Sequence, residues 1–281
     1  MASKLSGIEL TRYDDLFKTD AEREADRQER IQIVPAAEVF PYSRQPYTID
    51  RPTPDLVRLM DSIEHIGIAE PLIVRPRDTG GYEIISGHRR DYCAKAVGMD
   101  TRPVIVRNYS DEEADILVVD YNINREDLLP SEKAKAYKLK LDAMKHQGER
   151  VDLTSSQVGT KLRADEILAQ QAGSSRNQVQ RYIRLTELIP ELMDMVDEKK
   201  IALNPAYELS FLKKEEQVDL LDAMDSEQAT PSLSQAQRLK KYSQEGYLTL
   251  DMMRVIMGEE KKSDLDRVTF TSDTLRKYFP K

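Results

Sequence analysis

The chain has 281 residues, of which 50 are acidic and 42 are basic, so its formal net charge is -8. A chain of this length holds one large domain or two to three small ones, and 33% charged with 40% apolar residues is typical of a soluble globular protein. The negative total argues against nucleic-acid binding, because nucleic-acid-binding domains are usually basic, but it does not say where the charges lie.

The cysteine, histidine and apolar content excludes several further classes. The single cysteine, Cys93, rules out an internal disulfide and a cysteine-based zinc site. The three histidines (His65, His88 and His146) do not have the spacing of metal ligands. No apolar run approaches the roughly 18 residues of a membrane span, and the N-terminus lacks the apolar core of a signal peptide. We therefore expect a cytoplasmic protein with no membrane partner.

The first part of the chain predicts an arm and then a small mixed α/β domain. Residues 1–30 hold scattered charges with few apolar anchors, which indicates a mobile arm or a solvated helix. Residues 31–121 alternate short apolar runs with Pro and Gly, and Ser110 with Glu113 predicts a capping box that begins the last helix of this domain. The other expected elements are strands at 31–34, 72–74, 82–85 and 103–106, helices at 54–66 and 87–97, and a hairpin turn at 78–81.

Residues 122–257 predict an all-α domain, because they contain no convincing strand. Pro130 begins a long helix that we expect to end near His146, before Gly148, and residues 150–160 are predicted to form a loop. Residues 258–281 are expected to be a polar linker with a short tail, too small to fold alone. The predicted fold class is α+β, a mixed α/β domain followed by an all-α domain.

Residues 165–185 have the pattern of a helix-turn-helix. Ala169 allows the second helix to cross closely, Gly173 tolerates the positive φ of the turn, and Val179 and Tyr182 fit the inner face. Ser174 is expected to cap the second helix. The candidate DNA-binding residues, which can donate hydrogen bonds to phosphates and major-groove base edges, are Ser174, Ser175, Arg176, Asn177, Gln178, Arg181 and Arg184.

The alternative for this segment is an ordinary helical hairpin with a solvated polar face. Such a face usually includes Glu, whereas no acid lies between Gly173 and Thr186. Residues 161–185 carry five basic and two acidic residues, a net charge of +3, whereas residues 187–228 carry four basic and twelve acidic residues, a net charge of -8. The excess of acidic residues therefore lies in the segment that follows the helix-turn-helix and not in the helix-turn-helix itself. This distribution favours DNA binding.

Residues 84–90 place a strand, the turn Ser86-Gly87 and a helix start in succession. Backbone N–H groups at a helix N-terminus bind anions, and Arg89 and Arg90 add positive charge. The motif suits a nucleotide phosphate and a DNA phosphate equally well, and solvated arginines after a turn are the simpler alternative. Residues 122–127 are equally ambiguous, since a polar hinge that caps the next helix has the same composition.

Together these segments resemble the ParB/Spo-type partition protein family, which includes the Noc and KorB relatives. Four motifs follow the family's order across about residues 31–210, namely Arg44-Gln45-Pro46-Tyr47, Ser86-Gly87-His88-Arg89-Arg90, the segment 121–130, and the helix-turn-helix. The resemblance implies a ParB/sulfiredoxin-like N-terminal domain and a role in chromosome or plasmid partition. It also implies a homodimer, at least on double-stranded DNA, that CTP with Mg²⁺ converts into a sliding clamp, and a ParA-type ATPase as partner.

By position, the resemblance assigns nucleotide binding to Gln45, Ser86, Gly87, His88, Arg89, Arg90, Asn122 and Arg125, with Asn122 also near the metal. The family glutamate implicated in metal binding and hydrolysis is Tyr121 here, and a phenol cannot replace a carboxylate as a magnesium ligand. We therefore expect CTP hydrolysis to be weak or absent. The second-motif glutamate is His88, the arginine after Gln-Pro is Tyr47, and the usual C-terminal dimerisation domain is missing, which indicates a short and divergent member.

Two other functions remain open at this point. One is a transcriptional regulator whose N-terminal domain is an interaction module without a nucleotide. The other is a phosphotransferase of the sulfiredoxin fold. Sulfiredoxin itself needs a reactive cysteine just before its His-Arg pair, where this chain has Gly87, and Cys93 fits a small packed residue better. A thiol-dependent reductase is therefore disfavoured.

Overall fold

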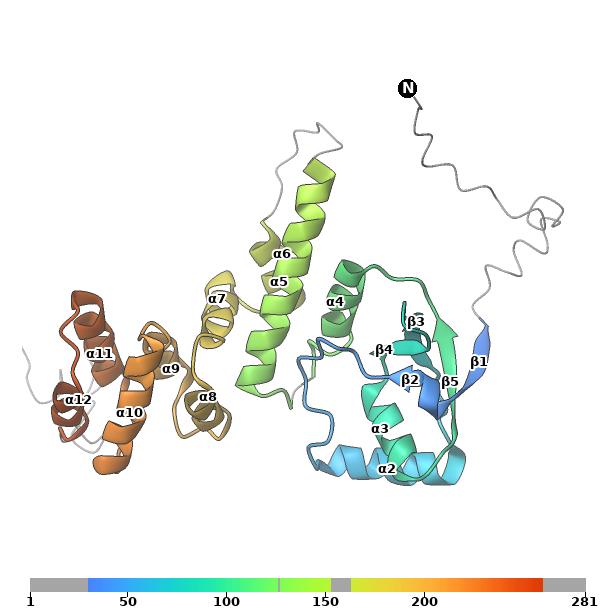
Figure 1. The fold of residues 1–281 in the computed structure, drawn as a ribbon, viewed down its shortest axis with the longest axis horizontal. Coiled ribbons are helices and arrows are strands. Elements are labelled where there is room, and N and C mark those ends of the chain that lie inside the picture. The colour runs from blue at the N-terminus through green and yellow to red at the C-terminus, as the bar shows by residue number, and fades with distance from the viewer. Residues whose placement is uncertain (1–29, 126, 153–162, 260–281) are drawn as a thin grey trace, which may run out of the picture. The chain divides into compact units, whose positions relative to one another are not determined.

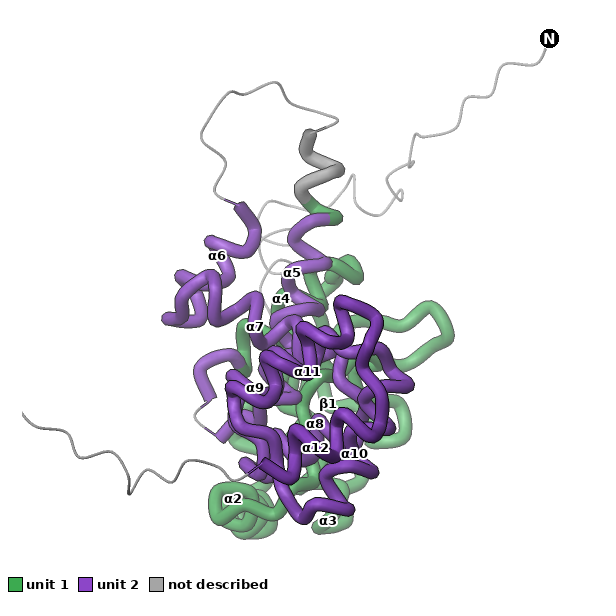
Figure 2. Tube along the Cα trace, turned by 90° about the vertical axis from the view of Figure 1, so that its left-hand side faces the viewer, with its two compact units in different colours: residues 1–122, 146–153 green, residues 123–145, 154–281 purple. Residues whose placement is uncertain are grey.

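The computed structural model describes residues 30–125, 127–152 and 163–259 (Figure 1). The chain divides into two compact units, residues 1–122 with 146–153 and residues 123–145 with 154–281 (Figure 2). The predicted N-terminal arm, the predicted C-terminal tail and most of the predicted loop at 150–160 lie outside the described residues. Among the described helices, none is long and apolar enough to cross a membrane.

A five-stranded mixed sheet lies at the centre of the first unit. Its order is β1-β5-β3-β4-β2, with β1–β5 and β3–β4 antiparallel and with β3–β5 and β2–β4 parallel. The strands are β1 (Ile31–Pro35), β2 (Val39–Phe40), β3 (Leu72–Pro76), β4 (Tyr82–Ser86) and β5 (Thr101–Val106), and η2 (Ala36–Glu38) is a single 3₁₀ turn. The four strands expected from the sequence are confirmed, whereas β2 was missed because two residues are too short to show a periodic pattern.

Three helices complete the first unit, namely α2 (Pro54–Ile66), α3 (His88–Ala96) and α4 (Asp111–Asp120). Thr53 caps α2 by accepting a hydrogen bond from Leu56 N at 3.2 Å, and the predicted capping box of Ser110 and Glu113 begins α4. Helix α2 packs on α3, and Cys93 is fully buried in the cluster between them, as the sequence favoured. Figure 1 shows α2 and α3 below strands β2, β3 and β4, and α4 to the left of these strands.

The described residues of the second unit form helices and contain no strand, which agrees with the all-α prediction. Its helices are α5 (Pro130–Asp152, whose last turns belong to the first unit), α6 (Ala164–Gln171), α7 (Arg176–Leu185), α8 (Pro190–Asp197), α9 (Leu203–Leu209), α10 (Lys214–Ser226), α11 (Leu233–Glu245) and α12 (Leu250–Met257). The predicted end of α5 near His146 is wrong, because the helix continues through Gly148 to Asp152. One glycine costs a helix only about 1 kcal/mol, and the residues around it are good helix formers.

Candidate functional site

The turn between β4 and α3 has a backbone that only glycine adopts readily. Gly87 precedes the first residue of α3 with φ at 103°, and a Cβ at this position would lie 2.5 Å from Leu72 Cδ2. The N–H groups in the first turn of any α-helix lack intrahelical acceptors. The turn Ser86-Gly87 thus leads directly into the first turn of α3. The N–H groups there, including that of His88, can bind an anion.

The two arginines of this turn have different surroundings. Arg90 NH1 donates to the carbonyl oxygens of Glu70 at 2.6 Å and Pro71 at 2.9 Å, and burial lowers the pKa of its guanidinium. Arg89 donates only through NH2, to Thr53 Oγ1 at 3.2 Å, and its Nε and NH1 have no partner among the described residues. Arg89 is therefore the guanidinium with donors to offer a ligand, whereas Arg90 is bound to the preceding loop.

The side chain of His88 lies inside the first unit, with 6% of its surface exposed. Its Nε2 accepts a hydrogen bond from the backbone N–H of Tyr42 at 3.3 Å, and burial lowers the pKa of the ring to about 4. The imidazole is thus neutral at neutral pH and occupied by a backbone donor. His88 can contribute its backbone N–H to an anion, while its ring holds the segment that begins at Tyr42.

Residues 42–47, which include the first motif (residues 44–47), form a loop held by buried side chains. The Tyr42 hydroxyl donates to Asp115 Oδ1 at 2.5 Å, Arg44 NH1 lies 2.8 Å from Asp115 Oδ2, and Ser43 N donates to Glu83 Oε1 at 2.9 Å. Gln45 Oε1 is buried and has no hydrogen-bond partner among the described residues. A buried acceptor without a donor is costly, so this oxygen is a candidate ligand contact.

Two buried carboxylates, Glu83 and Asp115, support this loop, and neither was predicted from the sequence. Glu83 also accepts from Arg75 Nε at 2.9 Å, and Arg75 NH1 lies 2.7 Å from Asp111 Oδ1. Burial raises the pKa of Asp115, against the opposing hydrogen bond from Tyr42. Each acid stands in an otherwise apolar stretch of a strand or helix, and a buried acid needs a partner. That pattern was the available signal, although it does not identify the partner.

The third motif lies at the end of α4, where Tyr121 is 44% exposed. The amide nitrogen of Asn122 donates to Val118 O at 2.9 Å, which leaves its Oδ1 as the atom able to ligate a metal. In the second unit, Arg125 forms two hydrogen bonds with Asp127, at 3.2 and 2.9 Å. The described residues contain no group of three or more His, Cys, Asp or Glu side chains that would hold a metal ion.

Helices α6 and α7 form the helix-turn-helix pair at the predicted place. Gly173 in the turn has φ at 58°, and Leu168, Ala169 and Val179 are buried together, which confirms the predicted packing. The predicted cap is wrong by one residue, because Ser175 Oγ accepts from Gln178 N at 3.2 Å. Ser174 instead lies in the turn, where its N–H donates to Ala169 O at 2.9 Å.

The outer face of α7 presents most of the predicted DNA-binding side chains to solvent. Arg181 is exposed, although its NH1 donates to Asn204 Oδ1 at 3.0 Å and its guanidinium lies 5.6 Å from the ring centre of Tyr207. Arg176 Nε donates to Asp165 Oδ2 at 2.5 Å. The exposed residues are Ser175, Arg176, Asn177, Gln178 and Arg181, whereas Ser174 and Arg184 are half-buried.

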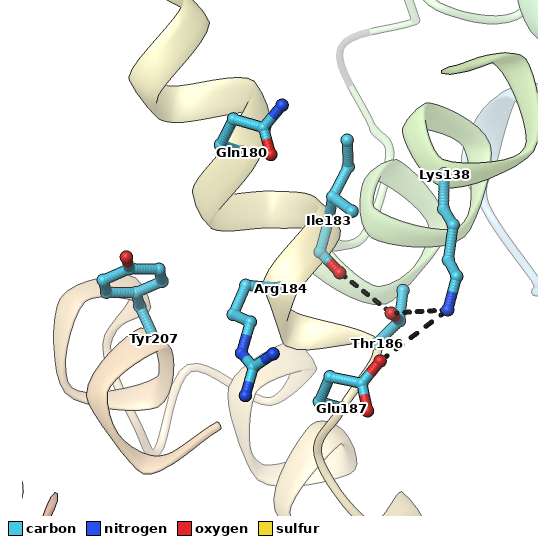
Figure 3. Close-up of a pocket in the computed structure, with 7 residues that line it drawn as sticks. All are labelled: Lys138, Gln180, Ile183, Arg184, Thr186, Glu187 and Tyr207. Atoms are coloured by element: carbon cyan, nitrogen blue, oxygen red, sulfur yellow. Dashed lines mark hydrogen bonds and ion pairs between the residues drawn. The ribbon is translucent and has the colours of Figure 1, made fainter. Parts of the chain in front are cut away.

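Arg184 lies at the other end of α7, and its guanidinium contacts protein groups. Its NH2 donates to Ser210 O at 3.0 Å, its guanidinium stacks 4.4 Å from the ring centre of Phe211, and its Nε is buried without a partner among the described residues. It borders a cavity of about 330 Å³ (Figure 3) lined by Lys138, Gln180, Ile183, Arg184, Thr186, Glu187 and Tyr207. Lys138 is the other cationic side chain in this lining, and its Nζ lies 3.7 Å from Glu187 Oε1. Arg184 therefore joins α7 to the end of α9.

Comparisons with known proteins agree with this arrangement. The family model of the ParB N-terminal domain matches residues 20–123, and that of the ParB helix-turn-helix domain matches residues 156–245. A nucleoid occlusion protein of Listeria monocytogenes is 33% identical over 190 residues, which are 67% of this chain and 60% of that protein. The chain thus matches about 60% of the length of such relatives.

Two solved structures are also similar, both of C-terminally truncated chromosome-partitioning protein ParB from Caulobacter crescentus. The one complexed to the centromeric parS site is 22% identical, with 80% of this chain and 98% of that chain covered and a TM-score of 0.43. The one complexed with CTP-gamma-S is 25% identical, with 70% and 99% covered and a TM-score of 0.32. Because the two family models together match well over half of the residues, the chain belongs to the ParB family.

Proposed function

We propose that the chain is a sequence-specific DNA-binding partition protein of the ParB type. It would act in the cytoplasm, on the nucleoid, in the segregation or maintenance of a replicon or mobile element. The observation that carries this proposal is the outer face of α7, a helix whose sequence contains no acid and which rests on a packed helix-turn-helix core. The exposed candidate DNA-binding residues of this helix are Arg176, Asn177, Gln178 and Arg181.

The charge distribution supports the same interface. Residues 161–185 have a net charge of +3, whereas residues 187–228 have a net charge of -8. Phosphates attract the first segment and repel the second, so the protein would meet DNA with α7 in front. We infer a homodimer at least on DNA, since helix-turn-helix proteins usually bind two half-sites related by two-fold symmetry. A ParA-type ATPase is the partner that the family resemblance adds.

Arg181→Ala tests the interface. We expect about 1–3 kcal/mol weaker binding to a selected DNA site if the arginine contacts a base. The matched control is Lys241→Ala, which removes one positive charge from an exposed position of α11. Affinity is measured by fluorescence anisotropy at one salt concentration, on a duplex selected from a random pool with the wild-type protein. Equal affinity of the two variants would place the interface elsewhere.

We also propose that the first unit binds CTP and that the nucleotide gates a DNA clamp. The N–H groups at the start of α3 and the Nε and NH1 of Arg89 fit a polyphosphate, and the orphaned Gln45 Oε1 fits a donor on the nucleotide. Within the first unit, the remaining residues that the resemblance assigns are Ser86, Gly87, His88, Arg90 and Asn122. For His88, only the backbone N–H is a candidate phosphate contact, because the ring already accepts a hydrogen bond from Tyr42 N.

A bound magnesium ion would supply charge neutralisation at the phosphates. Asn122 Oδ1 is the ligand that this chain offers, so phosphate oxygens and water would provide the rest of the coordination. Tyr121, at the end of α4, offers a phenol where the family has a carboxylate. We therefore propose that the chain binds CTP with little or no hydrolysis, so that release of the nucleotide, rather than its cleavage, would reopen the clamp.

Arg89→Ala is expected to weaken CTP binding at least about tenfold, because a hydrogen bond to a charged group contributes about 1.5–3 kcal/mol. Arg58→Ala is the matched control, since this arginine of α2 is 80% exposed and, within the described part of the chain, pairs only with Asp55. Calorimetric titration with CTP, ATP and GTP measures both affinity and base selectivity, and the same samples report phosphate release. If the wild type bound no nucleotide, the chain would instead be a DNA-binding regulator with a plain interaction domain.

A further inference from the structure

Helix α7 contains no acidic residue, but an acidic side chain of the neighbouring helix α6 contacts it. Asp165, at the start of α6, is 9% exposed, and its Oδ2 accepts from Arg176 Nε at 2.5 Å and from Gln180 Nε2 at 3.3 Å. Arg176 and Gln180 are four residues apart, so their side chains lie one above the other on α7. The carboxylate of α6 thus bonds to two exposed side chains on α7, one of which, Arg176, is a candidate DNA-binding residue.

This contact determines which donors of Arg176 stay available. Among the described residues Arg176 bonds only through Nε, while 44% of its side chain is exposed and its NH1 and NH2 have no partner. A guanidinium is planar, so a hydrogen bond at Nε also fixes the plane in which the two terminal nitrogens lie. The result is a pair of parallel donors at the N-terminal end of the helix, the end that contacts bases in helix-turn-helix proteins.

The state of the carboxylate agrees with this geometry. Burial alone would favour the neutral acid, yet the hydrogen bond and the charge of Arg176 hold the pKa of Asp165 below its usual value. Asp165 is therefore ionised at neutral pH and keeps Arg176 Nε as its donor. A pair with one partner this exposed adds little stability, about 0–1 kcal/mol in general. Stability therefore does not explain why an acid lies against the face that meets phosphates.

We propose that Asp165 is a positioning residue that orients Arg176 toward a guanine in the major groove and so determines the base preference at one position of the DNA site. Guanine presents two acceptors there, O6 and N7, which match two parallel donors, whereas adenine presents one acceptor and one donor. Gln180 is the second donor to Asp165 and limits its rotation. The inference rests on the proposed DNA-binding function and adds the residue that sets its specificity.

The test selects duplexes from a random pool with purified wild-type protein and with each variant, and it scores base preference at every position. Wild type should prefer guanine at one position, and Asp165→Ala should reduce that preference roughly tenfold, within the range for a bidentate contact. Asp165→Asn should have a smaller effect, because its amide oxygen can still accept from Nε. Arg176→Lys keeps the positive charge but loses the two parallel N–H donors of the guanidinium. It should therefore remove the base preference at the same position.

Two further variants separate positioning from general electrostatics. Glu166→Gln removes the neighbouring acid in the first turn of α6, which bonds to Arg163 N and not to Arg176. It should raise affinity for all sequences alike and leave the guanine preference unchanged. In the double variant Asp165→Ala with Arg176→Ala, the preference should match that of Arg176→Ala alone, since Asp165 acts through Arg176.

The outcomes are distinguishable. A wild type that selects no sequence would overturn the proposed function and this inference together. A wild type that selects a site, with Asp165→Ala preferring the same bases at every position, would overturn the inference and leave the function standing. An equal loss at all positions would also overturn it, because that is the signature of a merely structural residue.

Discussion

Replacing Gly87 by alanine is expected to lower the free energy of unfolding of the sheet-containing unit by about 2–5 kcal/mol. A left-handed backbone costs a residue with a Cβ about 1–2 kcal/mol, and overpacking a core adds about 1–3 kcal/mol. Both apply here, since φ is 103° and the new methyl group would lie 2.5 Å from Cδ2 of the fully buried Leu72. Hydrogen exchange of β4 and α3, followed by mass spectrometry, measures the change within that unit.

Gly80→Ala is the matched control for this substitution. Gly80 also has a positive φ, of 90°, but nothing lies within 4 Å of the position where its Cβ would be. It should therefore show only the backbone cost, about 1–2 kcal/mol. Combining Gly87→Ala with Leu72→Val, which removes the δ carbon, should recover part of the lost stability. The steric argument fails if Gly87→Ala and Gly80→Ala are equally destabilised.

Gln217→Leu is expected to lower the free energy of unfolding of the helical unit by about 2–5 kcal/mol. Gln217 is fully buried, and its Oε1 accepts from Ile189 N at 2.8 Å while its Nε2 donates to Glu187 O at 3.1 Å and Leu212 O at 3.0 Å. Leucine fills similar space but takes this partner from Ile189 N and Leu212 O, at about 1–3 kcal/mol each, whereas Glu187 O keeps Lys214 Nζ as a donor. Urea denaturation followed by circular dichroism measures the effect.

The same substitution at an exposed glutamine provides the reference. Gln244 is exposed on α11, and Gln244→Leu should change the free energy of unfolding by less than about 0.5 kcal/mol. Because both variants exchange the same side chains on helices, their difference isolates the buried hydrogen bonds. A Gln217→Leu variant as stable as Gln244→Leu would mean that the loops around Ile189 and Leu212 find other donors and acceptors.

Local patterns predicted most elements of the fold, because each depends on residues near in sequence. The capping box at Ser110, the turn at Gly173 and the strands of the hairpin are examples. Predictions failed where the free-energy difference between two competing local structures is small. At the cap of α7, two adjacent serines offer the same hydroxyl, and the turn takes Ser174 while the helix takes Ser175. In α5, a single glycine does not outweigh the helix on both sides of it.

The residue types of the candidate site could be predicted from the sequence, but the hydrogen-bond and stacking partners of those residues could not. The Gly-His-Arg-Arg turn and the polar face of α7 were visible as residue types, but neither pattern tells which donors remain available. Tyr42 and Asp115 are 73 positions apart, and only the sheet and α4 bring them together. Arg176 and Arg184 look equivalent in sequence, yet Arg176 bonds to Asp165 and stays exposed, whereas Arg184 stacks on Phe211. Such differences depend on partners that folding supplies.

The strand order of the sheet also sets an order for its assembly. The hairpin of β3 and β4 joins neighbouring segments, whereas β1 pairs with β5 across the whole of residues 36–100. Closing so long a loop is entropically slow, so we expect the hairpin to form early and β1 to dock on the edge only after β5 is in place. Of the strands in the described residues, β1 leaves the ribosome first during synthesis, and we expect it to be among the last to be fixed.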